Sequence, residues 1–263
     1  MKTYQEIISV VRGDIERLES EIIADLSFPN NALNELLLAP AKRIRPVLAF
    51  LFMRANGIEP TDEHFAIQTA VELAHFASLI HDDIIDISEK RRGISTLNTQ
   101  FGDKTAVLTG DYILSVALKK IVDKPEILHE FLETFSHMAQ GEINQYFTRF
   151  EIPTLEEYLQ KTIQKTAGLF RLALRNDFGL NFGIAFQINN DLKDINEDIK
   201  NGIYTAPVIF TGSTEITTEA LEKTKDLINT YLDKAASELE NLPRNKYSQA
   251  LREILGLYGY KLF

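Results

Sequence analysis

The sequence of 263 residues contains no cysteine and no tryptophan, and it is poor in proline and glycine. Without cysteine, the protein cannot form disulfides, hold zinc or iron–sulfur clusters through thiolates, or use a thiol nucleophile. Scarce proline and glycine mean few helix breakers, which favours helical structure. The remaining composition, 44% hydrophobic and 25% charged, is ordinary for a globular protein.

Positive charge is also in short supply, since 28 Lys and Arg face 38 Asp and Glu, for a net charge of −10. This balance argues against nucleic acid as a partner, because that affinity comes mainly from Lys and Arg. No apolar run approaches the roughly 18 residues of a membrane span, and the acidic N-terminal stretch lacks the apolar core of a signal peptide. We therefore expect a soluble, cytoplasmic protein without a transmembrane segment.

Apolar residues recur at spacings of three and four along most of the chain, which is the helical period. The expected helices are 4–24, 65–87, 104–122, 126–150, 155–175, 178–194, 216–241 and 245–258. No segment alternates convincingly between apolar and polar residues, so no sheet is expected. The sequence predicts an all-α protein of roughly ten helices, and the absence of a long linker favours one domain over residues 1–263.

The first of two acidic motifs is His81-Asp82-Asp83-Ile84-Ile85-Asp86, followed by Arg91-Arg92-Gly93. Asp82 and Asp86 are four residues apart, so both carboxylates would lie on one face of a helix, where like charges repel. Their presence beside an apolar segment suggests a bound cation. Oxygen ligands suit Mg²⁺, which binds one or two carboxylates plus substrate phosphates, and arginine suits the phosphates themselves.

The second motif, residues 187–194 (QINNDLKD), repeats this spacing with Asn190 and Asp194. An acidic pair on a helix is usually a solvated face, because acids are mostly exposed. The strongly apolar segments that precede both motifs argue against that interpretation here. Two such helices together with Arg and Lys clusters indicate a Mg²⁺–diphosphate site.

With these motifs in place, the chain resembles the trans-isoprenyl (polyprenyl) diphosphate synthases over most of its length. The motifs that carry the resemblance, in family order, are residues 41–46 (AKRIRP, with Ala for the family's Gly), 72–75, 78–86, 91–93, 110–112, 140–142, 165–166 and 186–187. Each is weak alone, but their order is highly specific. The resemblance implies a single large helical bundle of the isoprenoid synthase type around a central cavity, a Mg²⁺ cofactor and a homodimer.

The resemblance also implies a role for each matching residue. Arg91 and Lys165 would contact the diphosphate of an allylic substrate, and Thr166 and Gln187 would line that site. The diphosphate of isopentenyl diphosphate would be held by Lys42, Arg45, His75 and Arg92. The expected metal-site residues are Asp82, Asp83, Asp86, Asn190, Asp191 and Asp194. Without the resemblance, His75 would be read as a core histidine, although it lies two helical turns before Asp82 on the same face.

Product length depends, by resemblance, on the helix that precedes Asp82, along which the growing chain should run. Members that make short products often carry an aromatic residue five or four positions before the first Asp. Here these positions are Ala77 and Ser78, and Ala74 lies about one helical turn before them. All three side chains are small. We therefore predict a product longer than C20, in the range C25–C40.

The chain departs from the family pattern in several places. Asn190 stands where the family usually has Asp, and a diphosphate-binding loop that usually follows Asp194 is missing. Ile203 stands where the family usually has Lys, and Lys200 is a candidate to take over the role of that lysine. Two further shortenings fall near residues 170–178 and 211–213. Either the protein is a compact member of the family, or its natural chain carries further segments at these three places.

Three other interpretations compete with a polyprenyl diphosphate synthase. Asn190 and Ile203 would suit a non-catalytic or regulatory subunit of a heteromeric prenyl synthase. A related terpene cyclase would also tolerate an Asn-led second motif, although Lys42, Arg45 and His75 argue for a second diphosphate substrate. A helical scaffold without catalysis is the least specific alternative, because fold alone does not imply function.

Overall fold

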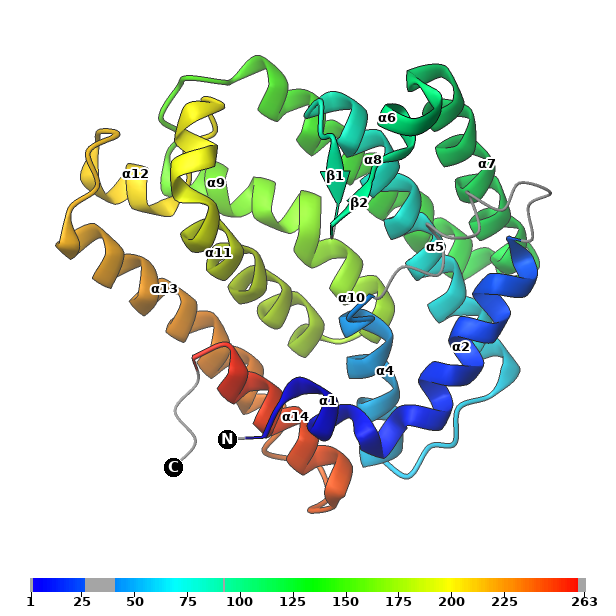
Figure 1. Cartoon of the computed structure of the whole chain (residues 1–263). Coiled ribbons are helices and arrows are strands. Elements are labelled where there is room, and N and C mark those ends of the chain that lie inside the picture. The colour runs from blue at the N-terminus through cyan, green and yellow to red at the C-terminus, as the bar shows by residue number, and fades with distance from the viewer. Residues whose placement is uncertain (1, 27–40, 92, 260–263) are drawn as a thin grey trace. The chain divides into compact units, whose positions relative to one another are not determined.

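Figure 1 shows the computed structural model of the chain, which describes residues 2–26, 41–91 and 93–259. Almost all of its regular structure is helical, which confirms the all-α prediction. The chain divides into two compact units, which are described separately. Unit 1 comprises Met1–Val10, Arg54–Gly57 and His129–Phe263, and unit 2 comprises Val11–Met53 and Ile58–Leu128. The single domain expected from the sequence stays a prediction.

Unit 2 is built around the long helix α5 (Asp62–Ile85), which packs along α7 (Asp103–Ile121) and against α2 (Arg12–Asp25). Its other elements are most of α4 (Ile44–Ala55), the short α6 (Leu97–Phe101), and the two-residue strands β1 (Lys90–Arg91) and β2 (Ile94–Ser95). The strands pair antiparallel, and Gly93 between them has φ 82°. The expectation of no sheet is therefore wrong at this hairpin, which is too short to show any alternation of apolar and polar residues.

Where α5 packs along α7, the His81 ring lies directly against Gly110. A Cβ atom at this position would overlap the imidazole ring of His81 on α5. The glycine in the 110–112 motif therefore leaves room for the His81 ring, which any side chain at this position would displace.

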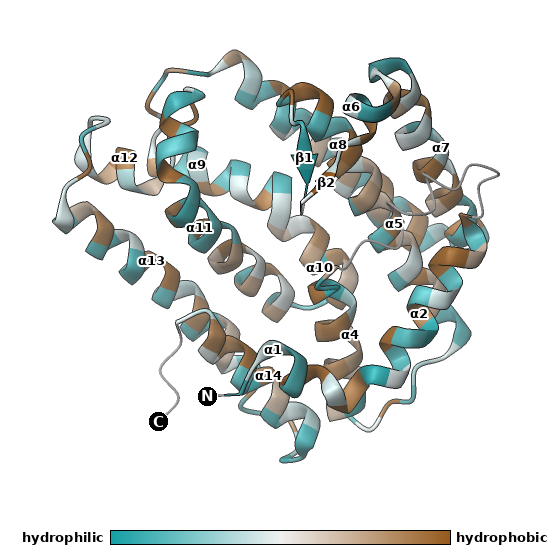
Figure 2. Cartoon of the chain, in the orientation of Figure 1, coloured by the Kyte–Doolittle hydropathy of each residue, from teal (hydrophilic) through white to brown (hydrophobic). Residues whose placement is uncertain are grey.

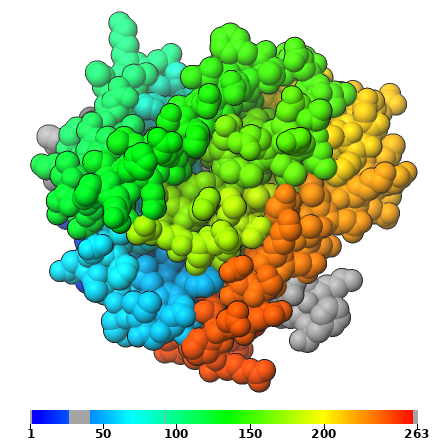
Figure 3. Space-filling view, turned by 180° about the vertical axis from the view of Figure 1, so that it is seen from behind, coloured from blue at the N-terminus to red at the C-terminus, as the bar shows by residue number. Residues whose placement is uncertain are grey.

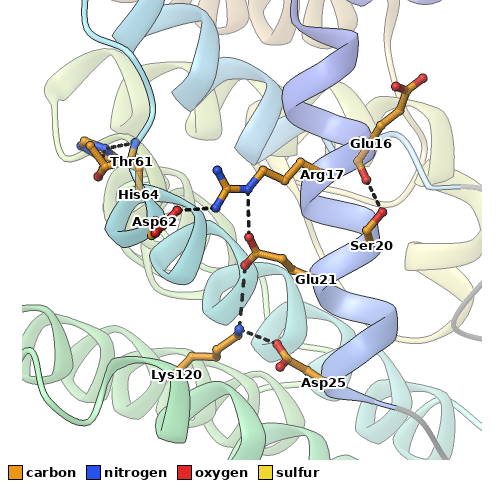
Figure 4. Close-up of polar contacts among 9 residues, drawn as sticks. All are labelled: Glu16, Arg17, Ser20, Glu21, Asp25, Thr61, Asp62, His64 and Lys120. Atoms are coloured by element: carbon orange, nitrogen blue, oxygen red, sulfur yellow. Dashed lines mark hydrogen bonds and ion pairs between the residues drawn. The ribbon is translucent and has the colours of Figure 1, made fainter.

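Ion pairs reinforce the same helices on the outside of unit 2 (Figure 4). Arg17 on α2 binds Asp62 at the start of α5, with 2.6 Å between Nη2 and Oδ1, and its guanidinium also lies 3.8 Å from the ring centroid of Phe65. Lys120 on α7 lies 2.8 Å from Asp25 on α2. Exposed pairs of this kind contribute only about 0.2–1 kcal/mol each, so the buried apolar faces hold the unit together.

Unit 1 contains α1 (Tyr4–Ile8), most of α8 (Pro125–Phe147) and a run of helices toward the C-terminus. That run is α9 (Leu155–Thr162), the π turn η2 (Ile163–Ala167), α10 (Gly168–Leu174), α11 (Asp177–Lys200), α12 (Ala206–Thr211), α13 (Thr218–Ser237) and α14 (Lys246–Leu257). Helix α11 packs against α10, η2 and α13. Phe170, Phe178 and Phe182 are fully buried where α10 meets α11, and their rings contact one another.

Several predicted helices are interrupted or shifted. The expected helix 155–175 consists of α9, η2 and α10, and a 3₁₀ turn at Ser9–Val11 interrupts the expected helix 4–24. Helix α11 runs six residues beyond its predicted end, and α4, α6 and α12 were not expected. Figure 2 shows the apolar character of α4 and the alternating polar and apolar turns of α2. Among the described residues, no helix is both long and apolar enough to cross a membrane.

The chain is continuous and locally well bonded at the place where the sequence looks shortened between α10 and α11. Arg175 ends α10 in the left-handed conformation, with φ 54°, and its N–H donates to the carbonyl of Arg171. Asn176 then begins α11 as its N-cap, because its side-chain oxygen accepts a hydrogen bond from the N–H of Gly179 at 3.0 Å. Two residues therefore suffice to join the two helices.

Candidate active site

The first acidic motif lies at the C-terminal end of α5. Asp82 is half-buried in the last helical turn, and Asp86 is exposed and forms the C-cap, with its N–H 2.8 Å from the carbonyl oxygen of Asp82. The helix ends there because Ile87 adopts a positive φ of 53°. The i, i+4 relationship expected for Asp82 and Asp86 is thus present at the end of the helix.

Asp83, between them, is turned toward a different partner. Its side chain is 8% exposed, and both of its oxygens accept hydrogen bonds from Nε of Arg91, at 2.9 and 3.0 Å. The Nη2 atom of Arg91 also lies 2.8 Å from Oδ1. The buried carboxylate therefore holds the arginine that was predicted to bind the allylic diphosphate, while the predicted Arg92 lies outside the described residues.

The predicted residues upstream on α5 occupy its buried and half-buried faces. Ala74 and Ala77 are no more than 1% exposed, and Ser78 is half-buried with its hydroxyl donating to the carbonyl of His75 at 2.9 Å. His75 is itself half-buried. No large side chain is therefore present at Ala74, Ala77 or Ser78. The predicted role of these residues in product length requires this.

Near the start of α4, two predicted substrate-binding residues have different surroundings. Lys42 is exposed, whereas Arg45 is 6% exposed, and burial lowers the pKa of Arg45 to about 10 although the nearby Glu72 partly offsets this effect. Arg45 still carries its charge at neutral pH. Arg43 binds Glu72 with 3.0 Å between Nη1 and Oε2, so it serves the packing of unit 2.

In unit 1, the π turn η2 presents Lys165 and Thr166. Lys165 lies 2.7 Å from Oε2 of Glu142 on α8, and the Thr166 hydroxyl donates to Oε1 of Gln187 on α11 at 2.7 Å. Helix α11 can approach this turn because residue 183 is glycine: a Cβ there would lie 2.7 Å from the Cα of Ala167. A π turn is rare and is often found at functional sites.

Gln187 continues into a second hydrogen-bonded pair. Its amide nitrogen donates to Oδ1 of Asp191 at 2.6 Å, and the Tyr158 hydroxyl donates to Oδ2 of the same carboxylate at 2.5 Å. Burial raises the pKa of Asp191, although both hydrogen bonds act in the opposite direction. The pKa of Tyr158 is raised well above its ordinary value by burial and by the charge of Asp191, so its hydroxyl stays a donor.

The other residues of the second motif lie nearer the surface. Asn190 is half-buried, its amide oxygen lies 3.4 Å from Nζ of Lys193, and Asp194 and Lys200 are exposed. Asp198, one turn after Asp194, has a pKa raised to about 7 by burial and by the charges of Asp191 and Asp194. This end of α11 therefore gathers negative charge, as a site for cations should.

Three residues near this turn were not assigned a role from the sequence. They are Tyr158, Glu142 and Lys161. Burial lowers the pKa of Lys161, and the neighbouring charge of Lys165 lowers it further. Glu142 lies in the 140–142 motif, which marks it as a candidate site residue. Tyr158 lies in none of the motifs, and only its position seven residues before Lys165 relates it to the site.

The donor set fits Mg²⁺ bound together with a substrate. Across residues 2–26, 41–91 and 93–259, no group of three or more His, Asp or Glu side chains is placed to hold a metal by itself. Mg²⁺ is usually bound by one or two carboxylates plus substrate phosphates and waters, rather than by a cage made of protein alone. In unit 2, Asp82 and Asp86 carry carboxylate oxygens of that kind, and in unit 1 Asp194 carries a carboxylate and Asn190 an amide oxygen. Metal ligation by these residues stays a prediction.

Acidic helix ends, an arginine held by a carboxylate and a lysine on a π turn are features that suit the binding of metal-bound diphosphates. Residues 28–242 match the family model described as polyprenyl synthetase. The chain belongs to this family and is a prenyltransferase.

Named relatives extend over nearly the whole chain. A prenyl transferase of Cyanophora paradoxa is 31% identical over 279 residues, which cover 85% of this chain and 86% of the relative. Solanesyl diphosphate synthase 1 of Arabidopsis thaliana, described as chloroplastic, is 29% identical over 312 residues, covering 95% and 77%. Both alignments are longer than this chain of 263 residues, so both relatives contain segments that this chain lacks.

The fold is that of known synthases. A decaprenyl diphosphate synthase from Rhodobacter capsulatus superposes with a TM-score of 0.87 at 23% identity, covering 97% of this chain and 98% of the other. The heptaprenyl diphosphate synthase of Staphylococcus aureus gives the same TM-score at 22% identity, covering 95% and 98%. At these identities the likeness establishes the fold, which confirms the predicted isoprenoid synthase type.

Proposed function

We propose that this prenyltransferase is a Mg²⁺-dependent polyprenyl diphosphate synthase that joins isopentenyl diphosphate to an allylic diphosphate, head to tail. The observation that carries the proposal is the end of α5, where Asp82 and Asp86 share the last turn and Asp83 fixes Arg91 beside them. Such an arrangement offers two metal ligands and a diphosphate-binding guanidinium within one short segment. In unit 1, Lys165, Thr166 and Gln187 are proposed as residues that bind the allylic substrate.

In the proposed reaction, the C–O bond of the allylic diphosphate breaks and both electrons leave on the diphosphate oxygen. Bound Mg²⁺ would neutralise the charge that builds on this leaving group. Arg91 and Lys165 act in the same direction as fixed cations, each already oriented by a carboxylate partner. The double bond of isopentenyl diphosphate then attacks the allylic cation to form one C–C bond, and a proton passes to the released diphosphate.

The same proposal assigns the second diphosphate to Lys42, Arg45, His75 and Arg92, with Lys200 as an additional cation. Arg45 suits this role in one respect, because its burial would make any diphosphate contact strong in the absence of competing water. Lys42 and Lys200 are both exposed, so their long side chains can reach a substrate from the surface. No serine or histidine nucleophile is needed, and the apolar interior would keep water away from the cation.

A product longer than C20 is proposed from the small residues on α5 and from the names of the relatives. Ala74 and Ala77 are buried, and Ser78 is half-buried, so no aromatic ring from these positions would block a growing chain. The relatives include solanesyl diphosphate synthases and a mitochondrial hexaprenyl pyrophosphate synthase of Yarrowia lipolytica. All of these names denote long-chain products.

A heteromeric enzyme is the second candidate. One relative, from Geobacillus stearothermophilus, is named heptaprenyl diphosphate synthase component 2 and is 29% identical over 92% of this chain. Asn190, in place of an acidic ligand, would suit a chain that is non-catalytic or that acts only with a second component. The complete first motif and the Lys165–Thr166 pair favour catalysis by this chain.

Homodimer formation and a cytoplasmic location are further parts of the proposal. Val107, Leu108 and Tyr112 are 42–70% exposed on one face of α7, and such apolar exposure suits a subunit contact. Helix α8, at the surface in Figure 3, exposes Leu132, Ile143 and Phe147. Relatives named as chloroplastic and mitochondrial make location a separate question, which imaging of a tagged chain in its own cell would answer.

The deciding experiment incubates the purified chain with radiolabelled isopentenyl diphosphate and geranyl, farnesyl or geranylgeranyl diphosphate, with Mg²⁺ or with EDTA. We expect Mg²⁺-dependent incorporation and, by chromatography, products longer than C20. Incorporation only after a second component is added would support the heteromeric enzyme. A cyclic hydrocarbon formed from the allylic diphosphate alone would indicate a terpene cyclase, and no incorporation with any primer would overturn the synthase.

A further inference from the structure

The carboxylate of Asp191 is occupied on both sides by donors from two different elements. Tyr158 on α9 donates to Oδ2, and Gln187, one turn earlier on α11, donates to Oδ1. Asp191 is 8% exposed and Tyr158 is 1% exposed, so water does not compete strongly for these contacts. Two short hydrogen bonds fix a buried carboxylate in one orientation. Asn190 and Asp194 lie nearer the surface, so Asp191 is the most firmly held of the three.

This carboxylate decides which way the Gln187 amide faces. An ionised carboxylate only accepts hydrogen bonds, so the NH₂ group of Gln187 must face Asp191. The amide oxygen then faces η2, where it accepts the hydroxyl proton of Thr166 at 2.7 Å. If the amide turned over, its oxygen would meet the carboxylate and the Thr166 contact would have to be rebuilt.

We propose that Asp191, itself held by Tyr158, is a positioning residue for Gln187 rather than a ligand of Mg²⁺. The role rests on the proposed function, in which Gln187 and Thr166 line the site where the allylic cation forms. An amide oxygen carries partial negative charge and stabilises a neighbouring cation, whereas an amide NH₂ group opposes it. Tyr158, more than a helical turn away from Lys165, thereby influences the chemistry through Asp191 and Gln187 without contacting the substrate.

Two substitutions test this role while preserving the size of the side chains. Asp191→Asn can keep its oxygen on Tyr158 and turn its NH₂ group toward Gln187, which would reverse the Gln187 amide without a loss of hydrogen bonds. Tyr158→Phe removes one of the two donors that orient the carboxylate. We expect kcat to fall about 10- to 100-fold in both variants, the order of effect that misplaced groups near a reacting centre produce. The KM values and the Mg²⁺ concentration for half-maximal rate should stay unchanged.

Tyr231→Phe is the matched control, because this tyrosine lies on α13 and, among the described residues, takes no part in the hydrogen bonds that join Tyr158, Asp191, Gln187 and Thr166. It should keep the wild-type kcat. A double-mutant cycle separates positioning from general loosening of the fold: in a Gln187→Leu background, Tyr158→Phe should cause no further loss, since its target is gone. A Tyr158→Phe effect of equal size in both backgrounds would contradict the proposal.

Other results distinguish this idea from the synthase proposal. If Asp191→Asn recovers the wild-type kcat at high Mg²⁺, Asp191 is a metal ligand and the positioning role is wrong. The proton exchange of the Gln187 side-chain amide, followed by NMR, is independent of turnover. It should be slowed relative to free glutamine in wild type and about 10-fold faster in Asp191→Ala. Wild-type exchange as fast as in free glutamine would overturn the positioning role even in an active synthase, and a wild type without turnover would refute the synthase instead.

Discussion

Asp83 and Arg91 form a three-contact pair in which the acid is buried and the arginine is about one-third exposed. The pair joins the end of α5 to β1, so it sets the position of the hairpin as well as that of the guanidinium. Asn98 on α6 adds to this junction, because its amide donates to the carbonyl oxygen of Asp83 at 3.3 Å. Within this acidic motif, Asp83 therefore holds the hairpin, whereas metal binding by Asp82 and Asp86 stays a prediction.

Replacement of Asp83 should therefore damage both stability and substrate binding. Asp83→Asn leaves the Arg91 guanidinium without its charged acceptor, and we expect the free energy of unfolding to fall by about 2 kcal/mol. The KM for the allylic diphosphate should rise about 10-fold, because each 1.4 kcal/mol of lost orientation corresponds to that factor. Urea denaturation and steady-state kinetics measure the two effects. Glu89→Gln, at an exposed neighbouring position, should change neither value.

Product length should respond to residues on one face of α5. Ala77→Phe and Ser78→Phe introduce a ring five and four residues before Asp82, and both should shorten the product by one or more C5 units. Leu79→Phe is the control, because this half-buried residue of α5 lies at least 100° around the helix from both Ala77 and Ser78. Chromatography of the products checks the prediction, with thermal unfolding to show that the variants are folded. A wild-type C15 product would contradict it outright.

Asp198 should make the folded chain less stable as pH rises. Its pKa is about 7 in the folded chain against an ordinary value of 3.8, so between these values the folded state binds more protons than the unfolded state. The free energy of unfolding then falls as pH rises from about 4 to about 7, and the loss persists above pH 7. Asp198→Asn should be more stable than wild type at pH 8 and equal to it at pH 4.

Urea denaturation at both pH values, in EDTA to remove divalent cations, tests this difference. The exposed Asp226 on α13 offers a control, since Asp226→Asn should leave the pH dependence of wild type intact. An Asp198→Asn variant less stable than wild type at pH 8 would show that the carboxylate is stabilised by its neighbours. Lys161 and Lys165, which lower the pKa of Asp198, would be the residues responsible.

Gly183 and Gly13 should respond in opposite ways to the same substitution. A Cβ at Gly183 would lie 2.7 Å from the Cα of Ala167, a backbone atom that cannot move aside easily, so Gly183→Ala should cost about 1–3 kcal/mol. Gly13 lies in α2, where a Cβ atom would meet nothing within 4 Å, and Gly13→Ala should stabilise by about 0.5–1 kcal/mol. Thermal unfolding of the two variants distinguishes close packing from helix propensity, and equal signs would contradict the assignment.

The sequence predicts the helices that carry the site because their apolar period is long and their starts are marked. Thr154 and Glu157 form the expected capping box of α9, with the N–H of Glu157 3.2 Å from the Thr154 hydroxyl. The π turn was missed because the apolar period continues through it, and its wide turn depends on contact with α11. The spacing of apolar residues shows only which face of a helix is buried. Whether a turn widens into a π turn depends on what packs against that face.

The sequence also could not show that carboxylates within one acidic motif have different hydrogen-bond partners. Spacing shows which carboxylates share a helix face, but the partner of Asp83 lies eight residues away and that of Asp191 lies 33 residues away. Nothing local marks Tyr158 as the donor to Asp191. Three expectations stay predictions: metal ligation, the dimer, and the substrate contacts of Lys42, Arg45, His75 and Lys200.

The number of residues in the π turn is itself a structural feature, and substitutions do not test it. A π turn holds about one residue more than an α-helical turn, so removal of one residue from Ile163–Ala167 would restore regular helix. The helical residues on either side would then keep their relative phase, because the π turn absorbs its extra residue without additional rotation. Tyr158 lies before the turn, whereas Lys165 and Thr166 lie within it. A single-residue deletion here would therefore leave α9 and α10 in phase and change only the turn that carries Lys165 and Thr166.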